Sequence, residues 1–171
     1  MNLTKYLETE GKQETVHISY GGEQILHGGH SYALAEPFSM DLKVDHDEKG
    51  TCFISGEGGM ELHAECDRCL DPVEIRVPVR IGERFTQEEI TEGDPDGGHY
   101  YLDGYELDTD LLIEDAVRVE FPVKILCKED CRGICMICGH NLNESDCGCD
   151  RYVPDPRMAA IGDMFAAAKS K

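Results

Sequence analysis

Apolar and polar residues alternate along several stretches in the first half of the chain. Residues 14–20, 38–46 and 51–65 each place apolar side chains at about every second position. This period of two is typical of strands with one face on a core and the other in water. The clearest case is residues 73–81, where Val and Ile alternate with charged residues and with Pro78. Proline has no backbone N–H for a sheet ladder, so Pro78 predicts that this strand lies at the edge of an antiparallel sheet.

Glycines, cysteines and acidic residues interrupt the alternation. The glycine-rich residues 21–29 predict a turn, and residues 56–59 predict that residues 51–65 form either a strand pair or one bent strand. The segment Cys66-Asp-Arg-Cys69 joins two predicted strands, which places it at the tip of a hairpin. The acidic residues 86–98 predict a loop.

A helical period appears in three places. Residues 109–120 carry an apolar face, with Thr109 as the expected N-cap and Pro122 after the end. Residues 154–171 carry an apolar stripe after Asp155-Pro156. Residues 1–10 predict a short helix or a loose terminus. Together with a short strand within residues 100–107, these patterns predict an α+β fold: an antiparallel sheet, barrel-like or sandwiched, with few helices.

The same patterns predict three segments. Residues 1–122 form a β-rich domain that carries the CxxC hairpin, residues 123–153 form a cysteine-rich, zinc-ribbon-like module, and residues 154–171 form a C-terminal helix. The 171 residues are enough for one ordinary domain and a small appended module.

Charge narrows the range of partners. Sixteen basic residues against thirty-five acidic ones give a formal net charge of −19. Binding to a nucleic-acid backbone depends on Lys and Arg that neutralise phosphates, so this balance disfavours direct RNA binding. It favours contact with a basic partner, or it serves solubility alone.

The expected compartment is the cytoplasm. The start of the chain lacks the basic residues and apolar core of a signal peptide, and no stretch approaches the length of a membrane span. Thiols stay reduced in the cytoplasm, so the nine cysteines favour metal binding over disulfides.

Six of the nine cysteines fall within residues 127–149. The centre of this segment is Cys135-Met-Ile-Cys138-Gly139. Two thiols at this spacing can face one ion, and the glycine relieves crowding where the chain turns. Cys147-Gly-Cys149 supplies a second half for a tetrahedral zinc site.

Eight cysteines form four close pairs, which is enough for two tetrathiolate sites. The candidate ligands are Cys66, Cys69, Cys127, Cys131, Cys135, Cys138, Cys147 and Cys149. The simplest assignment closes one site within the last four and joins the first four in another. An alternative is a single zinc ion, with Cys127 or Cys131 completing the Cys135/Cys138 knuckle. In either case the zinc is structural, since four thiolates leave no position for water.

Other chemistry has weaker support. Cys66-Asp-Arg-Cys69 is also the spacing of a dithiol oxidoreductase, but such a motif usually opens a helix, and here it joins two predicted strands. Cys52 lies in a predicted strand as a small apolar residue. No phosphate loop or Ser-His-Asp order stands out, so nothing in the sequence favours an enzyme, a catalytic residue or a small-molecule substrate.

The order and spacing of these segments resemble the YceD family, the large ribosomal RNA subunit accumulation proteins of bacteria and plastids. The resemblance covers roughly residues 30–165, and Met136 stands where the family more often has Pro. The matching segments are Cys66-Asp-Arg-Cys69-Leu-Asp-Pro-Val, Gly104-Tyr-Glu-Leu-Asp108, Phe121-Pro-Val-Lys-Ile-Leu-Cys127, Cys131-Arg-Gly-Ile-Cys135-Met-Ile-Cys138-Gly-His-Asn-Leu-Asn143, Cys147-Gly-Cys149 and Asp155-Pro-Arg157.

The resemblance implies a non-enzymatic role in ribosome biogenesis, in the synthesis, processing or accumulation of large-subunit ribosomal RNA. The expected partner is a basic ribosomal protein or a pre-ribosomal particle. Direct RNA contact would depend on a local basic patch. The candidates are Arg68, Arg76, Arg80 and Arg84, of which Arg76 and Arg80 share the polar face of one strand. The alternatives are a thiol oxidoreductase and a zinc-ribbon adaptor unrelated to ribosomes.

Overall fold

The computed structural model describes residues 1–8, 13–46, 50–92 and 100–150. The chain divides into two compact units. The first contains Met1–Cys66 and Asp71–Cys127, and it holds every helix and strand named below. The second contains Asp67–Leu70 and the chain from Lys128 onward, described to residue 150. The helix predicted over residues 154–171 lies outside the described residues, and the three-segment division stays a prediction.

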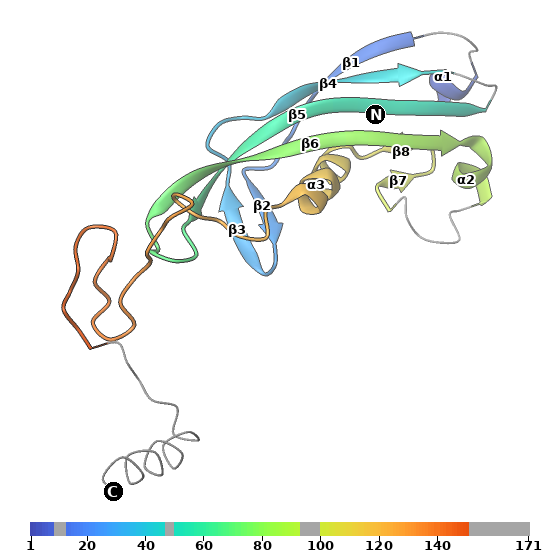
Figure 1. Ribbon diagram of the computed structural model, residues 1–171. Coiled ribbons are helices and arrows are strands. Elements are labelled where there is room, and N and C mark those ends of the chain that lie inside the picture. Colours follow the sequence, from blue (N-terminus) through green and yellow to red (C-terminus); the bar gives the residue numbers. More distant parts are fainter. Residues whose placement is uncertain (9–12, 47–49, 93–99, 151–171) are drawn as a thin grey trace, which may run out of the picture. The chain divides into compact units, whose positions relative to one another are not determined.

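The first unit is built on a four-stranded antiparallel sheet in the order β1-β4-β5-β6 (Figure 1). Strands β5 and β6 are long and lie side by side, paired over their whole lengths. The prediction of an antiparallel sheet with few helices is confirmed, whereas a barrel or sandwich is not. The strands are β1 (Gln13–Ser19), β4 (Ser39–Asp45), β5 (Thr51–Glu65) and β6 (Pro72–Thr86).

Strand β6 follows the predicted alternation. Val77, Val79 and Ile81 are buried, and Arg76 and Arg80 are exposed on the opposite face. The strand lies at an edge of the sheet, as the proline at position 78 predicted. The side chains on its inner face join one hydrophobic core with those of β4 and β5. Burial of this face fixes the register in which β6 pairs with β5, because a shift of one residue would turn the apolar side chains towards solvent.

The glycines of β5 do not break the strand. Strand β5 runs without interruption for 15 residues, so the alternative of a strand pair over residues 51–65 is wrong. A Cβ atom on Gly56 would lie 2.8 Å from side-chain atoms of both Met40 and Leu42, and one on Gly58 would lie 3.1 Å from the Phe38 ring. Because these glycines have no side chain, Met40 and Leu42 of β4 pack directly on the backbone of β5, as does Phe38, which directly precedes β4.

The smaller elements correct two predictions. Residues 21–29 are not only a turn, because β2 (Gln24–His27) pairs with β3 (His30–Ala33) across Gly28 and Gly29. Both glycines have positive φ, the conformation that tight hairpins require. The loop predicted for residues 86–98 is wrong for its described part, because α2 (Gln87–Glu92) continues directly from β6; residues 93–98 lie outside the described residues. A short helix and a small hairpin complete this set: α1 (Thr4–Leu7), β7 (Leu102–Asp103) and β8 (Glu106–Leu107).

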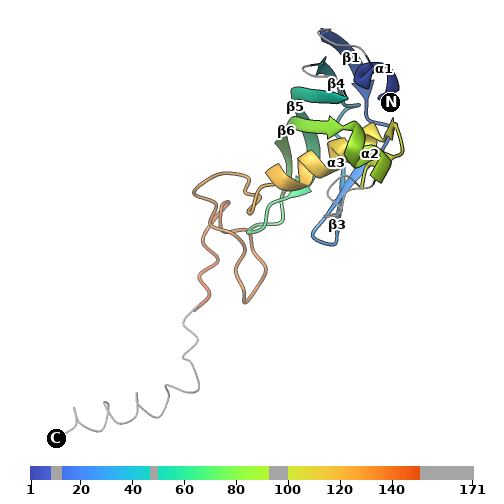
Figure 2. The same cartoon turned by 90° about the vertical axis from the view of Figure 1, so that its right-hand side faces the viewer.

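Helix α3 (Thr109–Glu120) lies across one face of the sheet (Figure 2). Leu112, Ile113 and Val117 are buried in the shared core, as the helical period predicted. The N-cap is Asp108, whose carboxylate accepts hydrogen bonds from two backbone N–H groups, so the prediction of Thr109 as cap is wrong by one residue. Among the described residues, no helix has the length and apolar character needed to cross a membrane.

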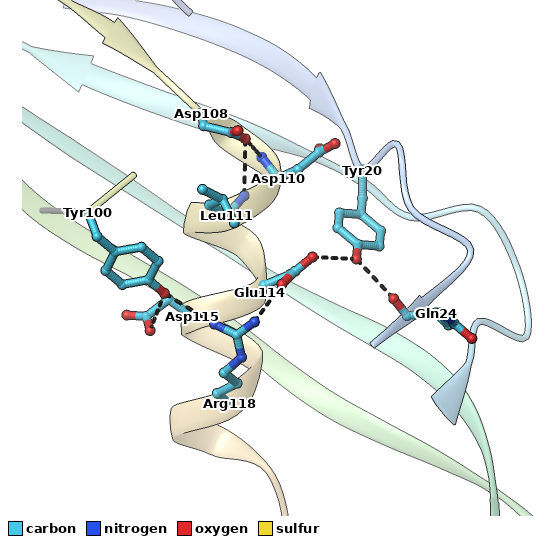
Figure 3. A network of polar contacts seen from close by, with 9 residues as sticks. All are labelled: Tyr20, Gln24, Tyr100, Asp108, Asp110, Leu111, Glu114, Asp115 and Arg118. Atoms are coloured by element: carbon cyan, nitrogen blue, oxygen red, sulfur yellow. Dashed lines mark hydrogen bonds and ion pairs between the residues drawn. The ribbon is translucent and has the colours of Figure 1, made fainter. Parts of the chain in front are cut away.

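A polar network ties α3 to its surroundings (Figure 3). The Tyr20 hydroxyl lies 3.0 Å from both a Glu114 carboxylate oxygen and the carbonyl oxygen of Gln24. Arg118 donates to Glu114 at 2.6 Å and to the Tyr100 hydroxyl at 3.2 Å. Burial and the Glu114 carboxylate raise the pKa of Tyr20. The network thus fixes the helix to the end of β1 and the start of β2 with a neutral Tyr20.

Candidate metal centres

The eight candidate ligands gather into two groups of four sulfurs. Within each group the sulfur atoms all lie within 4.8 Å of one another. The first group is Cys66, Cys69, Cys127 and Cys131; the second is Cys135, Cys138, Cys147 and Cys149. All nine cysteines lie in the described residues, and none forms a disulfide.

These groups fit a tetrahedral ion of zinc size. Zinc–sulfur bonds of about 2.3 Å place the four sulfurs of a tetrahedral site about 3.8 Å apart. Sulfurs already within 4.8 Å of one another reach that spacing through small side-chain rotations. Thiolate sets of this kind suit zinc, and four of them leave no open position for a reactive water. Each group could therefore hold one structural metal ion.

The second group is built on a tight turn. The backbone N–H groups of Cys138 and Ile137 donate to the Cys135 sulfur, which lowers the pKa of Cys135 to about 6. The Gly139 N–H donates to the Cys135 carbonyl at 2.8 Å, and Gly139 takes a φ of 73°. The two cysteine side chains thereby face the same point, as the CxxCG spacing predicts.

In the other half of the second group, the thiol of Cys149 holds its proton more tightly than an ordinary cysteine does. Hydrogen bonds with the Cys138 and Cys147 sulfurs raise the pKa of Cys149 to about 12. Metal binding releases such protons, so zinc affinity of this group should rise with pH. His140 is not among the gathered ligands, and its Nε2 atom lies 2.8 Å from the Ser145 hydroxyl.

The first group starts from a similar turn between β5 and β6. The Cys66 N–H donates to the Asp71 carbonyl at 2.9 Å, which closes the turn that carries Cys69. Leu70 follows the second cysteine, at the place that Gly139 takes in the other turn, and it has a φ of 62°. It is the one non-glycine residue with positive φ in the described part of the chain. Cys66 and Cys69 are both buried and lead into a strand, not into a helix.

Two side chains support the first group, a role that the sequence did not predict for either of them. Arg68 donates to the Cys131 carbonyl at 2.8 Å, and its own carbonyl accepts from the Ile134 N–H at 3.0 Å. The Asn143 side chain donates to the Cys131 sulfur at 3.3 Å and accepts from the Arg132 N–H at 2.8 Å. Nothing in the spacing marks an Arg or Asn as a neighbour of a metal ligand, so only the folded arrangement identifies them.

Comparison with known proteins shows which family this chain resembles. The family described as "Large ribosomal RNA subunit accumulation protein YceD" matches residues 54–165. The chain belongs to the YceD family. The YceD match contains all eight gathered cysteines and leaves out Cys52.

Several curated proteins resemble this YceD chain. An uncharacterized protein of Mycobacterium tuberculosis is 34% identical over 131 residues, which cover 74% of this chain and 61% of that one. One of Mycobacterium leprae is 32% identical over 135 residues, 76% of this chain and 60% of that one. The chain thus spans about three-fifths of the length of these relatives. The chloroplastic "Large ribosomal RNA subunit accumulation protein YCED homolog 1" of Arabidopsis thaliana is 30% identical over 73 residues, 43% of this chain and 23% of that one. No solved structure matches.

Proposed function

We propose that this protein is a non-enzymatic ribosome biogenesis factor that supports the synthesis, processing or accumulation of large-subunit ribosomal RNA. Membership of the YceD family carries this proposal. The family description and the printed name of the Arabidopsis relative both refer to accumulation of that RNA. The protein acts in a reducing compartment, the cytoplasm, where its thiols remain available to metal.

Zinc is the cofactor in this proposal. One ion per cysteine group, two in all, fixes the shape of the described residues of the second unit (67–70 and 128–150), which contain few apolar side chains. Cys66, Cys69, Cys127 and Cys131 hold one ion, and Cys135, Cys138, Cys147 and Cys149 hold the other. Both ions are structural, since all four positions around each are thiolates.

The partner is a basic ribosomal protein or a pre-ribosomal particle. The formal net charge of −19 favours such a partner and opposes the RNA backbone. The strand arginines that a direct RNA contact would need are engaged in ion pairs. Arg80 lies 2.7 Å from the Glu120 carboxylate, and Arg76 lies 4.0 Å from Glu61. Protein–protein contact is therefore the favoured way in which the factor meets the particle.

Sedimentation of cell extracts tests the function directly. The tagged full chain should co-sediment with large-subunit precursors, and its depletion should lower the ratio of large- to small-subunit ribosomal RNA. Co-sedimentation should weaken as salt is raised, because exposed charges are screened. An unchanged RNA ratio together with absence from all ribosomal fractions would contradict the proposal.

A further inference from the structure

Three large apolar side chains of the second unit point into solvent. Met136 is 91% exposed, Leu70 is 58% exposed and Ile137 is 55% exposed. We name these three residues the apolar tip. Each stands inside or directly after one of the two CxxC turns. Isolated exposed apolar residues are common on proteins, but this group is concentrated in a unit with only 27 described residues (67–70 and 128–150).

Backbone hydrogen bonds hold the turn that carries Met136 and Ile137. The N–H groups of Cys138 and Ile137 are held by the Cys135 sulfur, and the Gly139 N–H is held by the Cys135 carbonyl. Met136 and Ile137 therefore stay at the outside of a fixed turn. A rigid turn presents apolar side chains at little cost in conformational entropy on binding.

The two turns are held together within the second unit. The Arg68 carbonyl accepts from the Ile134 N–H, and the Arg68 guanidinium donates to the Cys131 carbonyl. A Cβ atom on Gly133 would lie 2.9 Å from the Arg68 carbonyl oxygen, so the two segments are in close contact. Leu70 is thus carried on a segment that packs beside the one leading into the Met136 turn.

Charge selects the partner of the apolar tip. The described residues of the second unit carry six carboxylates and three basic side chains, and one of these, Arg68, is used inside the unit. A zinc ion with four thiolates adds a net charge of −2. Phosphates of RNA and anionic lipid surfaces are repelled by such a surrounding, whereas a basic protein is attracted.

We infer that the apolar tip is a docking surface for a basic protein with an apolar contact site. Met136 enters that site, since its flexible side chain adapts to the partner's shape, and the surrounding carboxylates meet the partner's Lys and Arg. This inference rests on the proposed function, in which the basic protein is a component of the large ribosomal subunit.

Site-specific crosslinking tests the inference with the full chain in cells. The photoreactive residue p-benzoyl-L-phenylalanine is introduced in place of Met136 and, as a control, in place of Leu26, which is 60% exposed in the first unit. We expect position 136 to crosslink to a basic protein of the large subunit and position 26 not to do so. Crosslinks from position 136 to ribosomal RNA or lipid alone, or no crosslink, would overturn the inference.

A binding measurement gives the second test. The probe is the protein mixture that lithium chloride strips from purified large subunits, resolved by mass spectrometry after capture. The double variant Met136→Ser with Ile137→Ser should capture the crosslinked protein at least about tenfold more weakly. Leu26→Ser should leave capture unchanged. Both variants should retain the zinc content of the unsubstituted protein, which shows that the fold survives.

The outcomes separate the docking surface from the function. Unchanged capture by the double variant, while it still co-sediments with large-subunit precursors, refutes the apolar tip and leaves the proposed function standing. If the unsubstituted protein itself neither co-sediments nor affects ribosomal RNA, the proposed function fails instead.

Discussion

Leu70 occupies a backbone conformation that leucine normally avoids. Its φ of 62° lies in the left-handed region, where a Cβ atom costs about 1–2 kcal/mol. The equivalent position of the second CxxC turn is Gly139, which adopts φ of 73° without that cost. The strained leucine is retained directly after a candidate metal ligand, and its side chain is exposed. The conformation therefore follows from the turn itself and not from packing of the side chain.

Substitution of Leu70 measures this strain. Leu70→Gly should change the free energy of unfolding by less than about 1 kcal/mol, since the relief of strain and the greater freedom of the unfolded glycine oppose each other. Leu70→Val should lower it by about 1–2 kcal/mol, because a β-branched side chain tolerates positive φ least. Chemical denaturation of the two variants side by side gives the comparison. A valine variant as stable as the glycine variant would argue against strain at this position.

Cys52 differs from the other eight cysteines. It is fully buried in β5, outside both groups, and burial raises the pKa of its thiol to about 11. A thiol in this state is a poor nucleophile at neutral pH. This environment fits the prediction that Cys52 serves as a small apolar residue.

The raised pKa of Cys52 makes the stability of the fold depend on pH. The unfolded chain ionises Cys52 near pH 9, and the folded chain ionises it only near pH 11. The stabilising effect of keeping the thiol neutral is therefore complete below about pH 9 and lost as the pH rises towards 11. Cys52→Ala should show a smaller fall in stability than the unsubstituted protein over that range. Equal falls, or rapid alkylation of native Cys52 by iodoacetamide at pH 8, would contradict this account.

At the scale of elements, the glycines of β5 determine how closely β4 can pack. The inner face of β5 is continuous from Cys52 to Leu62, but Gly56 and Gly58 place no side chain in its middle. Met40, Leu42 and Phe38 fill that space. The glycines thus belong to the core arrangement and do not mark a break.

A matched pair of glycine substitutions tests this role. Gly56→Ala should destabilise the protein by about 1–3 kcal/mol, because its Cβ would lie 3.0 Å from the Asp41 carbonyl oxygen as well as 2.8 Å from two side chains. Gly82→Ala, on the paired strand, should be nearly neutral, since its Cβ would meet only the Phe53 ring at 3.9 Å. The difference in thermal midpoint between the two variants is the measurement. Equal midpoints would refute the packing role of Gly56.

Strands with one buried face were predictable from the sequence, and elements with weak burial were not. Strands β1, β4 and β6 match the predicted alternation because in each of them every second side chain is buried or half-buried and most of the side chains between are exposed. Strand β3 buries none of its side chains fully, so no alternation marks the β2–β3 hairpin. The feature of the sequence that could have predicted this hairpin is the pair Gly28-Gly29, since two adjacent glycines between short strands favour a tight turn.

The ends of elements depend on side-chain hydrogen bonds that a pattern does not contain. Asp108 and Thr109 are both good N-caps, and the choice between them rests on which side chain reaches the free N–H groups. The cysteine groups were easier to predict, because the spacing of each close pair already limits where the two sulfurs can face. How the four pairs combine depends on the fold. The structure gathers Cys66, Cys69, Cys127 and Cys131 in one group and the last four cysteines in the other, which is the simplest assignment considered from the sequence.

At the scale of the whole molecule, acidity and cysteine content act together. The formal net charge of −19 disfavours binding to an RNA backbone, and the described residues of the second unit, 67–70 and 128–150, contain few apolar side chains to stabilise them. Metal ions held by thiolates would supply that stability, and the acidic surface would then meet a basic partner. Family membership directs this account to the large ribosomal subunit.

The zinc content of the freshly purified full chain tests the central claim most directly. Native mass spectrometry with elemental analysis should give two zinc ions per chain. The count should fall to one in the double variant Cys66→Ser with Cys69→Ser, and to one in Cys135→Ser with Cys138→Ser. A metal-free protein that stays folded and is unaffected by chelators would contradict the account.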